Sequence, residues 1–429
     1  MRVNLFKLFL LITVLFLSSA NMFGQVNWTK YPDNPLELLN GAPGSWNRNV
    51  CEASVLYNAD SSRYEMWFSG TAGNPVFPYR IGYAKSIDGI SWDLHPVPVL
   101  TPTSGTWDQF SVQFPFVIRE NGQYKMWYSS SPQSDYNQCK IGYATSSDGI
   151  NWTKLPNPIF EPGTDPWEAG GVMACYVMPV SGGYKIWYSG FTTSAIDGNV
   201  YIGYATSVDG ILWQRDTINN PVLEPGVSGL WDGKWVWYPQ VLFIDSMYYM
   251  YYAGTNIGYW GTVEVGLATS ADGITQWTKD SLNPVLSPSP GMWDGQKVEA
   301  SSVKLIGDSL WMWYSGNGSF LQMGLATSLF EPVSVEQETT LPTAFALEQN
   351  FPNPFNPSTK IGWQSPVGSH QIIKVFDVLG NEIVTLVDEF KPVGKYEVEF
   401  NASVLPSGVY FYRLNAGSFV ETRKMILIR

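Results

Sequence analysis

The sequence predicts an all-β protein: a five-bladed β-propeller followed by a small immunoglobulin-like β-sandwich. The first observation is a block of about sixty residues that occurs five times, because such self-similarity indicates one stacked structural unit. Its core reads Tyr-x-Met-Trp-Tyr-Ser-Gly, then Ile-Gly-Tyr-Ala-Thr-Ser-x-Asp-Gly-Ile-x-Trp. The second observation is that each copy holds four short runs rich in Val, Ile, Tyr and Trp between turn residues. The third is a shift to alternating strands after residue 330.

The second copy shows the expected blade. Its strands are predicted at 112–118, 124–129, 140–145 and 151–155, and Asn-Gly and Asp-Gly turns lie between them. Four antiparallel strands that repeat radially make a propeller blade.

The fifth copy is incomplete, because after residues 323–328 it has neither an Asp-Gly turn nor a Trp strand. Residues 27–32 (Asn-Trp-Thr-Lys-Tyr-Pro) copy residues 151–156 (Asn-Trp-Thr-Lys-Leu-Pro). We therefore expect the N-terminal strand to complete the last blade, which closes the ring and covers two strand edges.

Composition limits the partners. The 429 residues carry a net charge of −12, which argues against nucleic acid and anionic membranes, and 15% aromatic content suits neutral ligands such as sugars. An apolar run over 8–17, after Arg2 and Lys7, predicts a signal peptide over 1–24 and no membrane span in the mature protein. We expect a monomer without a cofactor; a structural Ca²⁺ in the channel is not indicated. The cysteines are expected to be buried strand residues: Cys51, Cys139 and Cys175.

Ligands of propellers bind where the central channel opens, so the inner strands should carry the site. Alignment of the copies places one residue of each blade at an equivalent position: Glu52, Gln113, Met173, Trp237 and Glu299. The two glutamates share a Glu-Ala-Ser setting, and because blades one and five are neighbours they should approach each other. Arg48 and Lys297 could neutralise them without any chemistry.

Other candidates surround this position. Trp235 and Trp237 lie on one strand face and could stack a sugar ring or simply fill the channel. Acidic residues follow a Trp in several copies and could either contribute from the channel mouth or join the blades: Asp108, Asp232 and Asp294. The Ser-x-Asp-Gly-x-x-Trp stretches resemble the Asp-box turns of sialidases, and we expect a structural role for them.

The repeats resemble the five-bladed propellers of glycoside hydrolase families 43, 32, 62 and 68 and the mannoside phosphorylases of family 130, over roughly residues 26–332. That resemblance implies a general acid, a Glu two residues before a Pro on an inner strand. In the alignment of the copies Glu52 and Glu299 occupy this register, with Ser54 and Ser301 in place of Pro. It also implies an Asp directly before the Pro, and in this alignment none of the corresponding residues is acidic: Ala53, Phe114, Ala174, Tyr238 and Ala300.

Three functions stay open at this point. A glycoside-active enzyme would use Glu299 as acid and Glu52 as its partner, with Asp108 as a further contributor, since cleavage ordinarily needs two carboxylates about 5–10 Å apart. A surface propeller could instead bind glycans without catalysis. An adhesion module is the third alternative.

The C-terminal segment resembles the type A sorting domain of the type IX secretion system. The matching stretches are 350–357 (Asn-Phe-Pro-Asn-Pro-Phe-Asn-Pro), 375–380, 407–414 and 424–429. The resemblance implies that residues 345–429 engage the secretion machinery and that the protein crosses the periplasm and outer membrane to be secreted or held at the cell surface. The expected organisation is a signal peptide (1–24), a propeller (25–331), a linker (332–344) and the sorting domain (345–429).

Overall fold

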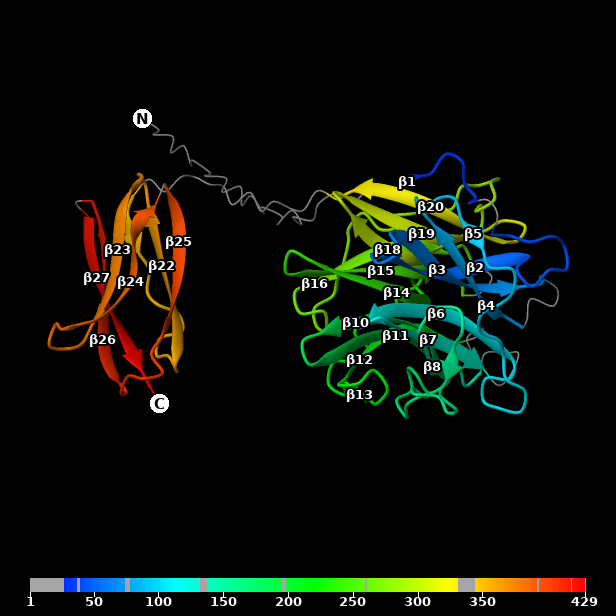
Figure 1. The fold of residues 1–429 in the computed structure, drawn as a ribbon, viewed down its shortest axis with the longest axis horizontal. Helices are drawn as coiled ribbons and strands as arrows, with labels where there is room; N and C mark the ends of the chain where they lie inside the picture. Colours follow the sequence, from blue (N-terminus) through cyan, green and yellow to red (C-terminus); the bar gives the residue numbers. More distant parts are fainter. Residues whose placement is uncertain are drawn as a thin grey trace, which may run out of the picture. The chain divides into compact units, whose positions relative to one another are not determined.

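The computed structural model describes residues 27–36, 39–73, 78–131, 137–193, 198–258, 261–330, 344–391, 393–417 and 419–428. The signal peptide predicted over 1–24 lies outside these residues, as does the linker predicted over 332–344 apart from its last residue. The chain divides into two compact units at residue 332, and we describe each by itself (Figure 1). In the described residues, all regular secondary structure consists of β-strands.

The first unit is a propeller of five four-stranded blades, as predicted. A parallel pairing of Val200 with Trp235 joins the third and fourth blades into one eight-stranded sheet. The inner strands are β2 (Asn49–Asn58), β6 (Ser111–Glu120), β10 (Gly171–Val180), β14 (Trp235–Ile244) and β18 (Lys297–Ile306). The second strands are β3 (Arg63–Thr71), β7 (Gln123–Ser131), β11 (Gly183–Phe191), β15 (Met247–Thr255) and β19 (Ser309–Asn317). The third strands are β4 (Arg80–Ser86), β8 (Lys140–Ser146), β12 (Val200–Ser207), β16 (Glu264–Ser270) and β20 (Leu321–Leu329). The outer strands are β5 (Asp93–Leu94), β9 (Thr153–Lys154), β13 (Trp213–Arg215), β17 (Thr278–Lys279) and β1 (Thr29–Lys30).

The ring closes as the sequence predicts. β1 pairs antiparallel with β20, with Thr29 opposite Thr327, so the N-terminal strand is the outer strand of the fifth blade. The inner strands contact one another in a full circle that ends with β18 against β2.

Neighbouring blades are joined by one repeated hydrogen bond. The indole of each second-strand tryptophan donates to the glycine carbonyl of an Asp-Gly turn in the next blade. The pairs are Trp67–Gly149, Trp127–Gly210, Trp187–Gly273 and Trp313–Gly89, all at 2.8–2.9 Å. The Asp-Gly turns therefore have the structural role that their sequence predicts.

The fourth blade departs from this pattern for a reason visible in the fifth. Tyr251 stands where the other blades have tryptophan, and the fifth copy has no Asp-Gly turn to receive an indole. The edge of Trp28, from the N-terminal segment, packs against the Tyr251 ring instead, with centroids 5.6 Å apart. The tyrosine in the fourth blade and the missing Asp-Gly turn in the fifth are thus parts of one contact between these two blades.

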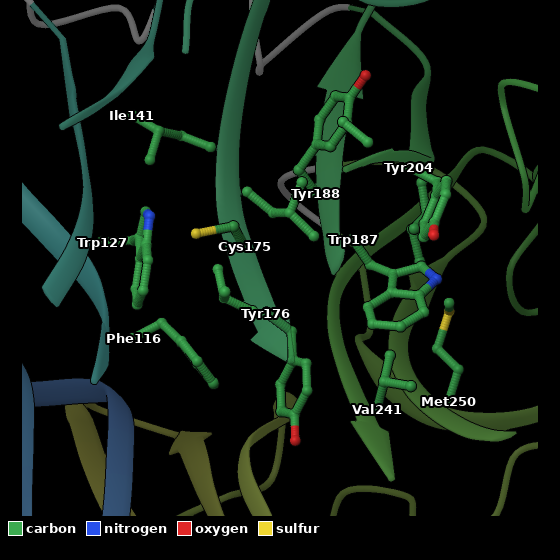
Figure 2. Packing of buried hydrophobic residues seen from close by; sticks show 14 of the residues in the cluster. Phe116, Trp127, Ile141, Cys175, Tyr176, Trp187, Tyr188, Tyr204, Val241 and Met250 are labelled. Atoms are coloured by element: carbon green, nitrogen blue, oxygen red, sulfur yellow. The ribbon is translucent and has the colours of Figure 1, made fainter. Parts of the chain in front are cut away.

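The propeller core is built from aromatic residues between blades (Figure 2). Phe116 and Tyr176 meet with ring centroids 4.6 Å apart, and Cys175 lies among the same residues. All three cysteines are buried, as predicted.

The second unit is a β-sandwich. One sheet holds β21 (Ala346–Leu347), β22 (Ser358–Ser365) and β25 (Gly394–Asn401). The other holds β24 (Glu382–Lys391), β23 (Ser369–Phe376), β26 (Gly408–Ala416) and β27 (Phe419–Leu427). Buried residues such as Trp363, Tyr412 and Met425 fill the space between the sheets, as the alternating pattern predicts.

Candidate functional site

A cavity of about 290 Å³ lies over the N-terminal ends of the inner strands, and each of the five strands contributes to it. Its charged and amide side chains come from blades one and five: Asn49, Glu52, Lys297, Glu299 and Asn317. Blades two to four contribute mainly apolar side chains: Phe114, Met173, Phe191, Val200, Trp235, Trp237 and Val263. One half of the cavity is therefore polar and the other apolar.

The strand pairing around a β-bulge in each inner strand shows that the register predicted for Glu52 is wrong by one residue. Cys51, not Glu52, pairs opposite Ser69, just as Gln113 pairs opposite Ser129 and Glu299 opposite Ser315. The hairpin after β2 has four residues, where those of the other blades have two, and this difference displaced the alignment.

The corrected register changes the meaning of Glu52. It corresponds to Phe114 and Tyr238, the residues directly before Pro115 and Pro239. That is the position at which the resemblance to the glycoside hydrolases implies an acidic residue. The first blade therefore carries an acid at the position directly before the proline of other blades. Glu299 of the fifth blade lies one residue earlier, at the position of Gln113.

The bulge holds these residues in a left-handed backbone conformation, which is uncommon outside glycine. Glu52 has φ 57°, Phe114 49° and Tyr238 53°. Each N–H donates to a serine of the preceding blade, for example Glu52 to Ser315 at 2.8 Å. The fourth blade has Ala253 instead of this serine, and the fifth blade, which carries Glu299, has a narrower bulge.

Glu52 is a buried acid whose pKa is raised. Burial raises its pKa to about 8, and the nearby charge of Glu299 also raises it, against the effect of hydrogen bonds from Ser69, the Phe114 N–H and Cys51. The Phe114 N–H lies 3.2 Å from the Glu52 carboxylate. Glu52 is therefore largely protonated at neutral pH.

Glu299 has a different environment. Burial raises the pKa of this carboxyl as well, but the Lys297 ammonium lowers it. Burial in turn lowers the pKa of Lys297, while the charge of Glu299 raises it. A nearby cation lowers the pKa of Glu299, whereas no cation contributes to the pKa of Glu52. The two glutamates therefore have different electrostatic environments.

Aromatic side chains line part of the cavity and pack behind its lining. Phe114 and Tyr238, from opposite sides of the ring, meet edge to face with centroids 5.1 Å apart. Trp235 and Trp237 line the apolar wall with centroids 5.3 Å apart, and the Trp235 indole donates to the Gly198 carbonyl. The structure brings both predicted tryptophans to the cavity with both predicted glutamates.

The acidic residues of the Trp-Asp pairs lie outside the cavity lining and in buried ion pairs. Lys154 binds Asp108 at 2.5 Å, Lys279 binds Asp232 at 2.6 Å and Lys30 binds Asp294 at 2.6 Å. A tyrosine hydroxyl donates to each: Tyr128, Tyr252 and Tyr314. Because these carboxylates join the outer strand to the blade, the expected role of Asp108 in catalysis and of Asp232 and Asp294 in binding has no support from their positions.

Two further candidates are also displaced from the cavity. The Arg48 guanidinium lies over the Phe320 ring, 4.2 Å from its centroid, rather than beside Glu52. Gln113 is fully buried behind the lining, because its strand presents Phe114 to the cavity instead.

Sequence reasoning missed Asn49 and Asn317. Asn317 follows Tyr-Ser-Gly in the fifth copy, where the first copy has Thr71 and the third has Phe191. Asn49 accepts a hydrogen bond from the Leu321 N–H at 2.9 Å. Comparison of the copies at this position would have found Asn317, since only the fifth has an amide there.

No three His, Cys, Asp or Glu side chains within the described ranges are placed to hold a metal ion. In the same part of the chain, no helix has the length and hydropathy needed to cross a membrane.

Comparison with known proteins defines the class first. Residues 349–428 match the secretion system C-terminal sorting domain, so the protein follows the type IX route to the cell surface or the exterior. The chain is 30% identical over 236 residues to the uncharacterized protein Rv1502 of Mycobacterium tuberculosis, covering 53% of this chain and 74% of that protein. It belongs to the same family as Rv1502.

A shorter match is to a relative whose name states an activity. The chain is 31% identical over 124 residues to the 1,2-beta-oligomannan phosphorylase of Thermoanaerobacter sp. strain X514, covering 28% of this chain and 41% of that protein. Solved structures show the same fold. A protein described as a GH130 glycoside hydrolase that targets β-1,2 mannosidic linkages has a TM-score of 0.56 at 16% identity, covering 71% of this chain and 94% of its own. A thermostable family-43 glycoside hydrolase has a TM-score of 0.52 at 20% identity, covering 68% and 92%.

Proposed function

We propose that the propeller is the carbohydrate-active part of an exported protein and that it cleaves glycosidic bonds with Glu52 and Glu299. The observation that carries this proposal is the presence of two buried carboxyl groups in one cavity, where Lys297 opposes the effect of burial on the pKa of Glu299 and no cation does so for Glu52. Glycoside cleavage needs one protonated and one ionised carboxyl group at the scissile bond.

In the proposed mechanism, Glu52 donates its proton to the glycosidic oxygen as the bond to the leaving sugar breaks. Ionised Glu299, beside Lys297, acts on the opposite side as the base that activates the incoming nucleophile or as the nucleophile itself. Trp235 and Trp237 would hold the sugar ring through its C–H face. The aromatic side chains around the buried glutamates provide a surrounding of low polarity, which strengthens the effect of the charges on the transition state.

These roles reverse the assignment that the resemblance implies, in which Glu299 is the acid. The reversal rests on the pKa of Glu52, raised to about 8, and on the Lys297 charge, which favours ionised Glu299. A carboxyl group with a pKa near the working pH suits an acid catalyst.

Oligosaccharides of mannose are the first substrates to test, because the Thermoanaerobacter relative is named for 1,2-beta-oligomannan. Arabino-, xylo- and fructo-oligosaccharides complete the panel, with inorganic phosphate present or absent to separate phosphorolysis from hydrolysis.

The experiment compares Glu52→Gln and Glu299→Gln with the control Glu224→Gln, which changes an exposed residue outside the cavity lining. Loss of the acid should lower turnover of natural glycosides about 10²–10⁴-fold and spare 2,4-dinitrophenyl glycosides, whose leaving group needs no proton. Loss of Glu299 should lower turnover of both. Equal loss for both substrates in both variants would contradict the assignment.

The alternative is a glycan-binding propeller without catalysis. It is favoured by the ion pairs that occupy Asp108, Asp232 and Asp294, which leave the two glutamates as the acidic side chains of the cavity lining. Binding of an oligosaccharide without turnover would support this alternative.

A further inference from the structure

We infer that a groove at the C-terminal ends of β2 and β18 binds a soluble amphiphilic carboxylate, a hydrocarbon chain with one carboxylate head. The groove, called the apolar groove below, measures about 530 Å³, within the roughly 300–1,000 Å³ typical of ligand pockets. Its walls are residues 55–57 of β2 and 304–306 of β18, with Tyr64 and Ile87 from the first blade. It shares no lining residue with the cavity of Glu52 and Glu299, so this site goes beyond the proposed function.

The apolar groove lies where the fifth blade meets the first. The Val55 N–H donates to the Ser302 hydroxyl at 3.2 Å, which holds β2 beside β18. The ring edges of Tyr57 and Tyr64 meet with centroids 5.1 Å apart in the wall. Tyr57, Ile87 and Leu305 are exposed to solvent although they are large and apolar. Exposed apolar side chains that gather at one place mark binding surfaces.

One cation stands in this apolar lining. Lys304 lies opposite Trp311 in the strand pairing, two residues before the aromatic residue that marks the centre of each second strand. The residues at the same position of the other four blades are apolar: Leu56, Ile118, Met178 and Leu242. Lys304 therefore replaces an apolar residue of the repeat, and it does so at the groove.

The ammonium of Lys304 lacks charge compensation within the described part of the chain. The side chain is partly buried, and burial alone lowers its pKa to about 8. No carboxylate contributes to this shift. Tyr57 and Tyr64 are the other titratable side chains of the lining, and burial raises the pKa of Tyr64. A buried charge without a partner is costly, so an anion that reaches the ammonium is favoured.

These features together specify the ligand. A carboxylate forms charge-assisted hydrogen bonds with an ammonium group, and its hydrocarbon chain covers the apolar walls. A dianion would leave one negative charge unpaired in the groove, so a single carboxylate is favoured.

The test uses calorimetry on the purified protein at pH 7 with octanoate, 1-octanol and acetate. Octanoate should bind at least about tenfold more tightly than 1-octanol, which lacks the charge, and than acetate, which lacks the chain. Equal affinities for octanoate and 1-octanol would overturn the inference, as would failure of octanoate to bind.

Two variants locate the site. Lys304→Met should weaken octanoate binding at least about tenfold and leave 1-octanol within about threefold. The third blade already has Met178 at this position, so the variant should fold. The control is Lys85→Met, which removes a cation of the first blade outside the groove and should change neither affinity. Unchanged octanoate binding in Lys304→Met would overturn the assignment.

Proton uptake tests the unsubstituted protein. A bound carboxylate should raise the pKa of Lys304, so at pH 8.5 binding should take up more than about half a proton, and at pH 6.5 almost none. Calorimetry in phosphate and in Tris, which differ in ionisation enthalpy, measures this uptake. Binding without uptake at pH 8.5 would overturn the role of Lys304. Cleavage of glycosides is measured separately, so failure here leaves the proposed function standing.

Discussion

The indole of Trp313 donates a 2.8 Å hydrogen bond to the carbonyl oxygen of Gly89 and so joins the fifth blade to the first. Trp313→Phe would leave this buried carbonyl without its donor, and we expect the free energy of unfolding to fall by about 1–3 kcal/mol. Tyr251→Phe is the matched control. The Tyr251 hydroxyl has no hydrogen-bond partner among the described residues, so its loss should be nearly neutral. Urea denaturation measures both; equal effects would contradict the role of the indole.

Lys30 should be necessary for ring closure. It binds Asp294, whose side chain is 1% exposed, and also contacts the Ser287 carbonyl and Ser289. Lys30→Met leaves a buried carboxylate uncompensated, which should cost about 3–5 kcal/mol. The control is Lys85→Met, because the exposed Lys85–Asp93 pair should contribute less than about 1 kcal/mol. Thermal unfolding of the two variants separates these cases, and similar melting temperatures would refute the prediction.

Glu52 should make the protein less stable as pH rises. Its pKa is about 8 in the folded state against an ordinary 4.5, so between these values the folded state holds a proton that the unfolded state has lost. The free energy of unfolding therefore decreases with rising pH across this window, at most about 1.4 kcal/mol per pH unit for one proton. Glu52→Gln should flatten the decrease and Glu224→Gln should not. An unchanged slope in Glu52→Gln would show that another group titrates.

Lys297 should set the ionisation of Glu299. The ammonium lowers the pKa of this carboxyl, so Lys297→Met should raise that pKa further. The acidic limb of the pH–rate profile, or of sugar binding if turnover is absent, should then move to higher pH. A profile that keeps its acidic limb while only the maximum falls would indicate a role in packing alone.

Ser69 should have two roles where Ser129 has one. Both accept the N–H of a bulge residue, Phe114 at 3.0 Å and Ala174 at 2.9 Å, but Ser69 also stabilises ionised Glu52. Ser69→Ala and Ser129→Ala should each cost about 1 kcal/mol of stability. Only Ser69→Ala should raise the pKa of Glu52 further, visible as a shift in the basic limb of the activity profile. Identical profiles for both variants would contradict this second role.

The repeats were sufficient to predict the blades, the closure by the N-terminal strand and the position of Glu52 and Glu299 on neighbouring blades, where both line one cavity. They could not fix the register at Glu52, because a longer hairpin after β2 and a bulge before it change the count between aromatic landmarks. They also could not separate Asp108 from the cavity, since its partner Lys154 lies on the outer strand and pairs with it only in the folded blade.

The pairing of β1 with β20 has a consequence for how the propeller forms. β1 is the first strand of the propeller to be synthesised, but its partner β20 lies near the end of the same unit, since Thr29 pairs with Thr327. Contacts between such distant positions form late, after the cost of closing a long loop has been met. A nascent chain therefore cannot finish the ring until almost the whole propeller has been made, and a chain truncated before β20 would leave β1 without its partner strand. The fold therefore makes closure of the ring depend on synthesis of the propeller through β20.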